Sequence, residues 1–433
     1  MPSSQYFFRH LEQQQELQIA RQRRQSEDEA LHQTMQSFFA ETAANNDQEA
    51  KEAVVLFWAL AYLGTPGLFR QMRTYLTRSD LSSYPMVHSA WAYMWKSRTD
   101  RAFITTMGID VHTFDDLLEC FSVRWDYSTI DRADVDHNGA PQTGRRSLDA
   151  AGTLALVLHW VCSTMPCYTF QQVFAVTPAV CSRYLASGMK QLLAVLQEHP
   201  QARFLWPTTK RKAREHAASI EKKYPLLTNC FGFLDGLNLP VLVSDDEDCI
   251  LAFATDGTIM YVILNAPGSW NGSTIAEPLY HQLLERTPPG YRVVSDTAFP
   301  RKSKRLQAHI LAPAKRGDRL PTKSLEFARL QLLNEQLVSA RQAAEWGMQL
   351  IQGSFARLKL PLPASDHQYR ANLLQLVCRL HQLRCRSVGI NQTATVYQSV
   401  WDDNHILCRD FHRMLFSDIQ GRCHISRYYD GWL

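Results

Sequence analysis

Apolar and polar positions change their spacing several times along the chain, and each change marks a predicted region. Residues 1–48 are rich in Gln, Glu and Arg and lack a periodic apolar stripe, which predicts a polar helical or disordered arm. From residue 49 to residue 127 apolar side chains recur at helical spacing, which predicts a helical region. Residues 128–147 are polar and rich in turn-forming Asp, Asn and Gly, so we expect a linker there.

Residues 148–214 contain three predicted helices, at 148–163, at 169–174 and after Val176. Thr177 and Pro178 mark the start of the third, because Thr is a good N-cap and Pro is favoured at the first helical position. Two helices joined by a tight turn are typical of a helix-turn-helix and also of an ordinary helical hairpin, which is commoner. Both interpretations stay open.

After a basic stretch at residues 210–214 the apolar spacing becomes that of strands. Short apolar runs at residues 231–243, 258–264 and 291–295 are bounded by Gly, Pro, Asn and Asp, and Asp256-Gly257 is a hairpin signal. Helical spacing returns at residues 275–284 and 324–359. We therefore expect a mixed α/β domain over residues 215–387, followed by a C-terminal extension at 388–433.

Composition narrows the class of protein. The chain has 433 residues, of which 45% are hydrophobic, so it is long enough for two or three domains and is not fibrous or wholly disordered. Its apolar runs are too short to cross a bilayer and no secretory signal is recognisable, so we expect an intracellular protein without a membrane anchor.

Ten cysteines occur without a CxxC pair, which indicates neither a secreted disulfide framework nor a classical zinc finger. Four potential zinc ligands lie near the C-terminus, namely His405, Cys408, His412 and Cys423. Their spacing matches no established zinc pattern, so ordinary buried Cys and His side chains are favoured there.

The net charge of +4 does not identify a partner, but its distribution is uneven. Residues 292–341 carry eleven Lys or Arg against four acidic residues. Such a block is typical of a solvated face and also of a surface that binds a polyanion, so neighbouring features must decide between them.

Three acidic residues stand out by their positions. Asp235 and Asp296 each end an apolar strand pattern, FGFLDGLNLP and YRVVSDTAFP, 61 positions apart. A single acid after a strand is more often a turn former or helix cap than a catalyst. Glu345 lies at the edge of the apolar stripe of a predicted helix, where an ordinary i,i+4 ion pair with Arg341 would also explain it.

Four blocks occur in a meaningful order: FGFLDGLNLP, LNAPGSW, YRVVSDTAFP and SARQAAEWGMQLIQGSFARLKLP. Together they resemble the Harbinger-type DDE endonuclease domain over residues 230–385, with a looser resemblance over residues 110–196. The resemblance implies an RNase H-like α/β fold with a mixed sheet, preceded by a helical, helix-turn-helix-like region. It makes Asp235, Asp296 and Glu345 the catalytic triad of a transposase-derived endonuclease that hydrolyses phosphodiester bonds in DNA.

The chemistry of the three acids agrees with that assignment. Carboxylates a few ångströms apart repel one another unless cations neutralise them. Hard oxygen ligands without Cys or His favour Mg²⁺ or Mn²⁺, and two such ions about 3.5–4 Å apart would serve phosphodiester hydrolysis. We expect Asp235 to bridge both ions, Asp296 to hold one and Glu345 the other.

The resemblance also implies DNA as the partner, a nuclear location and, in many members, an accessory DNA-binding protein. The expected phosphate contacts are the basic residues after Asp296 and after Glu345 and one in the helix-turn-helix-like region: Arg301, Lys302, Lys304, Arg305, Arg357, Lys359 and Arg183. The short basic runs at residues 21–24 and 210–212 are candidate nuclear import signals. Trp270 and Trp346 would stack on a base or, more commonly, pack in the core.

Two departures from the family pattern leave a second interpretation open. Asn271-Gly272 stands where the family usually has His-Asp, and the stretch between Pro240 and Asp256 is short enough to suggest a lost strand or connection. A lost strand would displace Asp235 relative to Asp296, and catalysis depends on their placement. The alternative is therefore a DNA-binding protein derived from such a nuclease, in which the three carboxylates no longer come together.

Overall fold

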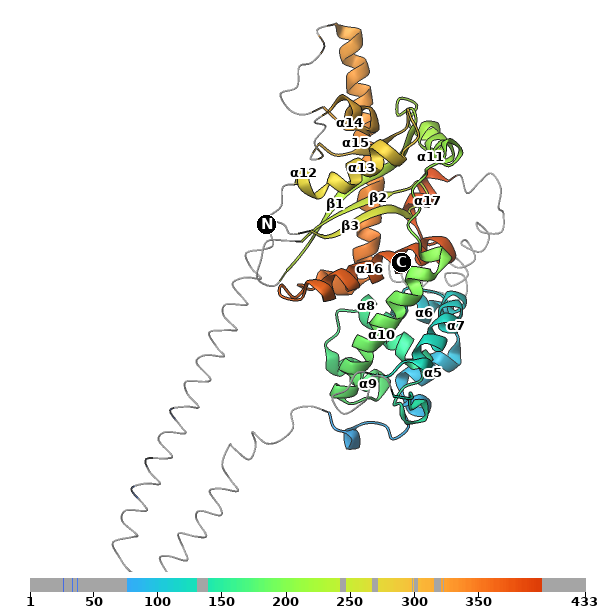
Figure 1. The fold of residues 1–433 in the computed structure, drawn as a ribbon, viewed down its shortest axis with the longest axis vertical. Helices are drawn as coiled ribbons and strands as arrows, with labels where there is room; N and C mark the ends of the chain where they lie inside the picture. Colours follow the sequence, from blue (N-terminus) through green and yellow to red (C-terminus); the bar gives the residue numbers. More distant parts are fainter. Residues whose placement is uncertain are drawn as a thin grey trace, which may run out of the picture. The chain divides into compact units, whose positions relative to one another are not determined.

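The structure, a computed structural model, describes residues 76–130, 139–241, 247–266, 272–297, 303–314 and 323–398, together with Ser26, Gln33, Ser37, Phe299 and Pro321. Several predictions therefore lie outside the described residues: nearly all of the arm at 1–48, residues 49–75 of the predicted helical region, residues 131–138 of the predicted linker, Trp270, Asn271, Arg301, Lys302, and the C-terminal extension from residue 399 with its His/Cys group. The described helices and strands belong to one compact unit within Leu76–Leu433 (Figure 1).

The N-terminal part of this unit is helical, as its apolar spacing predicts. Its helices are α4 (Pro85–His88), α5 (Ala90–Ser97), α6 (Asp100–Met107), α7 (Val111–Tyr127), α8 (Ala150–Cys162), α9 (Cys167–Phe174) and α10 (Pro178–Glu198), with 3₁₀ turns at Arg78–Asp80, Thr143–Arg145 and Pro200–Ala202. Asp110 and Asp149 cap α7 and α8 by accepting a backbone N–H with a side-chain oxygen. Helix α8 is buried along almost its whole length and forms the centre of this part.

The three helices predicted at residues 148–163, 169–174 and after Val176 are present as α8, α9 and α10. Helix α10 begins with Thr177 as N-cap and Pro178 at its first position, although the Thr177 hydroxyl accepts no capping hydrogen bond. Its apolar face packs against α7, α8 and α16. Whether α9 and α10 read DNA as a helix-turn-helix stays a prediction.

A five-stranded sheet follows, between α11 (Lys210–Lys223) and the C-terminal helices. Its strands are β1 (Cys230–Leu239), β2 (Glu247–Phe253), β3 (Ile259–Ala266), β4 (Arg292–Ser295) and β5 (Ile310–Leu311), in the spatial order β3-β2-β1-β4-β5. Strands β1, β4 and β5 are parallel neighbours, and β2 pairs antiparallel with both β1 and β3. The predicted strands at 231–243, 258–264 and 291–295 correspond to β1, β3 and β4.

Strand β2 corrects one expectation from the sequence. The short stretch after Pro240 suggested a lost strand, yet β2 pairs with β1 over seven positions, from Phe233 with Phe253 to Leu239 with Glu247. Its apolar run leads directly into the Asp256-Gly257 turn, where Gly257 has a positive φ of 75°. Strand β1 is therefore a central strand with a neighbour on each side, and Asp235 is not displaced by a missing strand.

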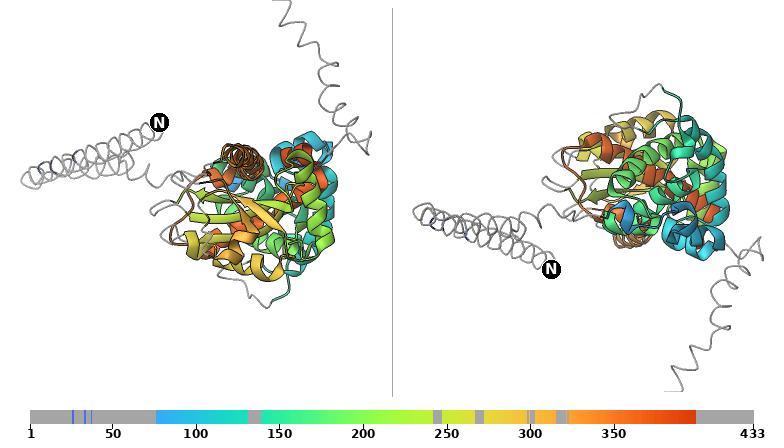
Figure 2. Two further views of the ribbon diagram at one scale, coloured as in Figure 1. Left: turned by 90° about the horizontal axis from the view of Figure 1, so that it is seen from above. Right: turned by 90° about the horizontal axis from the view of Figure 1, so that it is seen from below.

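The remaining helices cover the two faces of the sheet. They are α12 (Gly272–Ile275), α13 (Glu277–Arg286), α14 (Lys304–His309), α15 (Ser324–Ser354), α16 (His367–Leu383) and α17 (Gln392–Tyr397), with a 3₁₀ turn at Ala356–Lys359 and a π-helical turn at Arg384–Val388. One core cluster joins Phe233, Leu237 and Val294 to α15 and α16, and a second joins Phe231 and Leu234 to α13 and α14. Figure 2 (left) looks nearly along α15 and shows it on one side of the strands, with the yellow helices on the other.

Helix α15 approaches the sheet closely at one glycine. A Cβ atom on Gly347 would lie 2.6 Å from Cε1 of Phe253 in β2, so only glycine allows this contact without movement. The buried residues of α15 begin at Leu337, and the first half of the helix extends beyond the sheet (Figure 1). The second half of α15 is thus held against the sheet.

Helix α16 joins the sheet to the helical part. Its buried Gln382 accepts a hydrogen bond from the backbone N–H of Ile259 in β3 and donates to the carbonyl oxygens of Ile259 and Arg203. The same hydrophobic cluster contains residues of α8, α10, α15 and β1. Among the described residues, no helix is long and apolar enough to span a membrane.

Candidate active site

The two aspartates come together through the register of two neighbouring parallel strands. Leu234 of β1 is paired with Ser295 of β4, so the next residues, Asp235 and Asp296, lie side by side. Because side chains alternate between the faces of a sheet, Asp235 lies on the face of Phe233, and Asp296 on that of Val294. Phe233 and Val294 belong to the same core cluster. Both carboxylates are therefore on the face that α15 covers.

Glu345 is brought to this face by α15. The helix packs against β1, β2 and β4, with Ala340, Ala344 and Met348 buried on its inner side. Glu345 lies at the edge of that buried stripe, as its position in the sequence predicts, and 44% of its side chain is exposed. The three predicted acids thus come from β1, from the end of β4 and from the middle of α15.

Arg341 lies between two of these acids. Its Nη2 donates to Oε1 of Glu345 at 2.8 Å, and its Nη1 is 3.9 Å from Oδ2 of Asp296. The i,i+4 pair that offered the simpler explanation for Glu345 is therefore real. It does not stand alone, because the same guanidinium also reaches the sheet.

Asp235 interacts electrostatically with all three of these residues. Burial raises the pKa of its carboxyl, and the neighbouring Asp296 and Glu345 carboxylates raise it further. The backbone N–H of Gly236, which donates to Oδ1 of Asp235 at 2.9 Å, and the Arg341 guanidinium oppose this rise in pKa. The ionised form of Asp235 is therefore disfavoured unless positive charge is nearby.

The donor chemistry of this group fits a hard divalent cation, because its side chains offer carboxylate oxygens and no nitrogen or sulfur ligand. Their present arrangement is not that of a ligand shell. Within the part of the chain that the structure describes, no group of three or more His, Cys, Asp or Glu side chains could hold a metal ion as it stands. The Arg341 guanidinium is a positive charge in contact with both Asp296 and Glu345.

Of the basic residues predicted to contact DNA, Lys304 and Arg305 are exposed at the start of α14, after Ser303, which caps the helix with its hydroxyl. Lys359 is exposed at the end of the 3₁₀ turn Ala356–Lys359. Arg183 is partly buried near the start of α10.

Arg357 has a different environment from the one predicted. Its guanidinium lies 4.4 Å from the centre of the Trp160 ring, Nε donates to the carbonyl oxygen of Trp160, and Nη2 donates to that of Met165. The helix ends at Ser354, and the 3₁₀ turn that follows points this side chain at the helical part. Its contacts are those of a packing residue, so we omit Arg357 from the proposed DNA contacts.

The aromatic residue next to Glu345 is explained by packing. Trp346 is partly buried against the core cluster that includes Phe233 and α15, which agrees with the commoner of the two predicted roles. Sequence reasoning missed the bridging position of Arg341 and the close approach at Gly347. The local signal for Arg341 was its spacing of four residues from Glu345.

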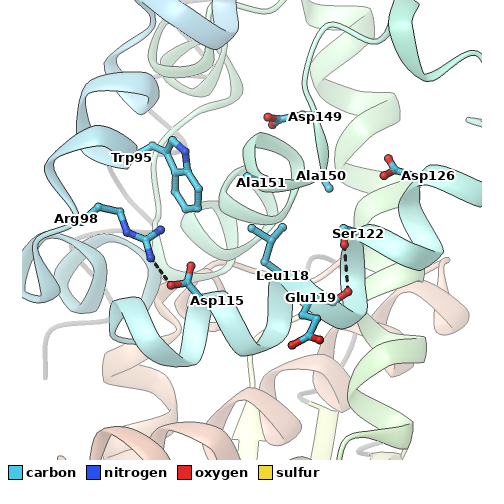
Figure 3. A pocket seen from close by; sticks show the side chains of 10 residues that line it. All are labelled: Trp95, Arg98, Asp115, Leu118, Glu119, Ser122, Asp126, Asp149, Ala150 and Ala151. Carbon is cyan, nitrogen blue, oxygen red and sulfur yellow. Dashed lines mark hydrogen bonds and ion pairs between the residues drawn. The ribbon is translucent and has the colours of Figure 1, made fainter.

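A second group of acids lines an open depression in the helical part, with a volume of about 540 Å³ (Figure 3). Its lining residues are Trp95, Arg98, Asp115, Leu118, Glu119, Ser122, Asp126, Asp149, Ala150 and Ala151. Arg98 pairs with Asp115 and lies over the Trp95 ring. Asp149 caps α8 by accepting the N–H of Gly152 at 2.7 Å. These side chains have local structural partners.

In a comparison with protein families, residues 248–382 match a family described as DDE superfamily endonuclease. The matched segment runs from β2 to α16 and includes Asp296 and Glu345 but not Asp235. This segment is therefore similar to DDE superfamily endonucleases, a class of nucleases that act on DNA and generally use divalent metal ions. Comparisons with curated proteins and with solved structures give no match.

Proposed function

We propose that this chain is a Harbinger-type, transposase-derived endonuclease that hydrolyses phosphodiester bonds in DNA with Mg²⁺ or Mn²⁺ held by Asp235, Asp296 and Glu345. The observation that carries the proposal is the register of β1 and β4, which makes Asp235 and Asp296 neighbours on the face covered by α15. The family match over residues 248–382 supports the nuclease class independently of that geometry.

We further propose that the α/β part has an RNase H-like fold. The order β3-β2-β1-β4-β5, with β2 alone antiparallel to the other strands, is the arrangement expected of such a sheet and supports this assignment. Strands β1 and β4 are adjacent and parallel in it, so Asp235 in the middle of β1 lies beside Asp296 at the carboxyl end of β4.

In this proposal each part of the chain has a defined task. Bound divalent ions, of which we propose two, would supply the Lewis acidity that phosphodiester hydrolysis requires. The Gly236 N–H orients the Asp235 carboxylate through its bond to Oδ1. The close packing of α15 on β2 limits the movement of Glu345. Lys304 and Arg305 follow Asp296 closely in the chain and are exposed for phosphate contacts.

Nicking of supercoiled plasmid DNA tests the proposal directly. We expect nicking with Mn²⁺, none with EDTA, and loss of nicking in Glu345→Gln. The matched control is Glu215→Gln, because Glu215 forms the same i,i+4 pair with Arg211 on the exposed surface of α11. Nicking that persists undiminished in Glu345→Gln would overturn the assigned site.

A second candidate function is DNA binding without catalysis. It is favoured by one observation: Asp296 and Glu345 are engaged by Arg341 rather than arranged as metal ligands. In this case α9 and α10 would act as a helix-turn-helix and Lys304 and Arg305 would bind phosphate. Salt-sensitive DNA binding without metal-dependent nicking would support this candidate over the first.

Both candidates place the protein in the nucleus, and we propose that location together with DNA as the partner. An accessory DNA-binding protein, as the Harbinger assignment implies, is part of the same proposal. Fluorescence microscopy of the tagged full chain, compared with a variant in which Lys210, Arg211 and Lys212 are replaced by Gln, tests the location and one of its two candidate import signals.

A further inference from the structure

One cation of the chain itself contacts the proposed metal ligands. Arg341 on α15 contacts Glu345 one turn later at 2.8 Å and reaches Asp296 at the end of β4 at 3.9 Å. It also interacts electrostatically with Asp235 on β1. The two carboxylates that it contacts come from different elements, so the guanidinium links the helix to the sheet.

The charges of this group explain why a cation is needed. Three carboxylates lie together in a partly buried place, with Asp296 only 23% exposed, and their mutual repulsion opposes the packing of α15 on the sheet. A guanidinium is positively charged at any physiological pH, and its planar fork can serve two carboxylates at once. Arg341 therefore reduces a repulsion that the metal-free protein would otherwise carry.

We propose that Arg341 is an internal counter-cation of the carboxylate group, which holds Asp296 and Glu345 in the metal-free protein and competes with divalent metal for them. This inference rests on the proposed function, since it takes these acids as the metal ligands. Arg341 is in this view a positioning residue, and its contact with Asp296 and Glu345 is given up when the metal binds.

Arg341 is able to leave the two carboxylates by movement of its side chain. The Arg341 side chain is 33% exposed and that of Glu345 is 44% exposed, so both reach solvent at the edge of α15. A long arginine side chain can leave through its own torsions while its helix stays in place. Two cations near the same carboxylates repel each other, so metal is bound more weakly while Arg341 is present.

Isothermal titration calorimetry with Mn²⁺ measures this competition without reference to activity. We expect Arg341→Gln to bind Mn²⁺ more tightly than the wild type, on the order of tenfold, because the competing charge is removed. Arg341→Lys should lie between the two, since a lysine point charge cannot serve both carboxylates as the guanidinium fork does. Arg211→Gln, which breaks a matched exposed i,i+4 pair on α11, should leave the affinity unchanged.

Thermal unfolding gives a second readout. In EDTA we expect Arg341→Gln to melt below the wild type, and in saturating Mn²⁺ we expect the difference to disappear, because the ion then neutralises the carboxylates. An Arg341→Gln affinity equal to or weaker than that of the wild type would overturn the inference. If this variant does not fold, an unchanged or weaker affinity in Arg341→Lys overturns it instead.

Asp235→Asn distinguishes a failure of the proposed metal site from a failure of the proposed competition by Arg341. If Mn²⁺ binding by the wild type does not depend on Asp235, the proposed metal site itself is wrong. If that binding depends on Asp235 but not on Arg341, the proposed site stands and only the competition is wrong.

Discussion

Among the described residues, acids gather in the depression of the helical part and at the sheet, and the two groups differ in what holds them there. In the depression of the helical part, Asp115 pairs with Arg98 and Asp149 caps α8. At the sheet, by contrast, burial and like-charged neighbours raise the pKa of Asp235. The first group has individual structural tasks on an exposed surface, while the second concentrates charge where folding disfavours it.

This difference indicates where function is to be sought. The acids of the first group stabilise their own surroundings, so their contribution to stability alone explains why they are there. A carboxylate whose ionised form is disfavoured by its surroundings needs another reason, and perturbed groups of this kind cluster at functional sites. Proximity of acids in a cleft is thus a weaker indicator than a group of interacting, partly buried carboxylates on neighbouring strands. Substitutions in and around both groups test this contrast.

The largest expected effect is on activity. Asp235→Asn should lower Mn²⁺-dependent nicking by roughly a hundredfold or more, since changes that only support a ligand already cost 10–100-fold. Asp115→Asn, in the other acidic group, should change the nicking rate by less than about twofold, because surface substitutions away from a site have small effects. Comparable losses in both variants would remove the distinction between the two groups.

The next effect concerns the packing of Gly347 on Phe253, which holds the part of α15 that carries Glu345. Gly347→Ala would place a Cβ atom against the Phe253 ring, and such overpacking costs about 1–3 kcal/mol of unfolding free energy. Displacement of α15 should also lower the nicking rate. Gly353→Ala is the matched control in the same helix, because nothing lies within 4 Å of its Cβ, and it should stabilise by up to about 1 kcal/mol. Urea unfolding monitored by circular dichroism measures both variants.

The third prediction is that removing the charge of Asp235 and removing that of Asp149 change stability in opposite directions. In EDTA at pH 7, Asp235→Asn should raise the melting temperature, because it removes a buried negative charge and can keep the bond from the Gly236 N–H. Asp149→Ala should destabilise by about 1 kcal/mol through loss of the α8 N-cap. A lower melting temperature of Asp235→Asn in EDTA would contradict the claim that the ionised Asp235 carboxylate destabilises the folded protein.

The pH dependence of the Asp235 effect follows from its raised pKa. A carboxyl with a higher pKa in the folded state holds its proton more tightly there, so its cost to stability grows as pH rises through the interval between the unfolded and folded pKa values. The rise in melting temperature caused by Asp235→Asn should therefore reach its full size above the pKa of Asp235 in the folded protein. It should vanish below the ordinary aspartate pKa. Melting curves in EDTA at a series of pH values test this.

The smallest effect is expected at the other arginine. The side chains of Arg98 and Asp115 are 37% and 44% exposed, and exposed ion pairs contribute about 0–1 kcal/mol. Arg98→Gln should thus lower stability only slightly and leave Mn²⁺ affinity unchanged. A change in Mn²⁺ affinity like that expected for Arg341→Gln would show that the two arginines act alike.

Much of the secondary structure could be predicted because its signals are local. Thr177 and Pro178 begin α10, Asp256 and Gly257 form the turn before β3, and the helical spacing of apolar residues located α15 with Glu345 at the edge of its buried stripe. Strand β2 was missed because its first two residues are acidic, which interrupts the apolar pattern of a strand. Pairing with β1 and β3 on both sides defines it instead.

The sequence by itself determined most of the helices and strands, the three candidate acids and the i,i+4 pair of Arg341 with Glu345, since these depend on residues close together in the chain. Tertiary structure decided that Asp235 and Asp296 are neighbours, that Arg341 also reaches Asp296, and that Arg357 packs on Trp160. These contacts join residues far apart in the chain. They depend on which distant strands pair and on how closely a helix packs on a sheet, and the spacing of residues near one another in the chain does not specify either.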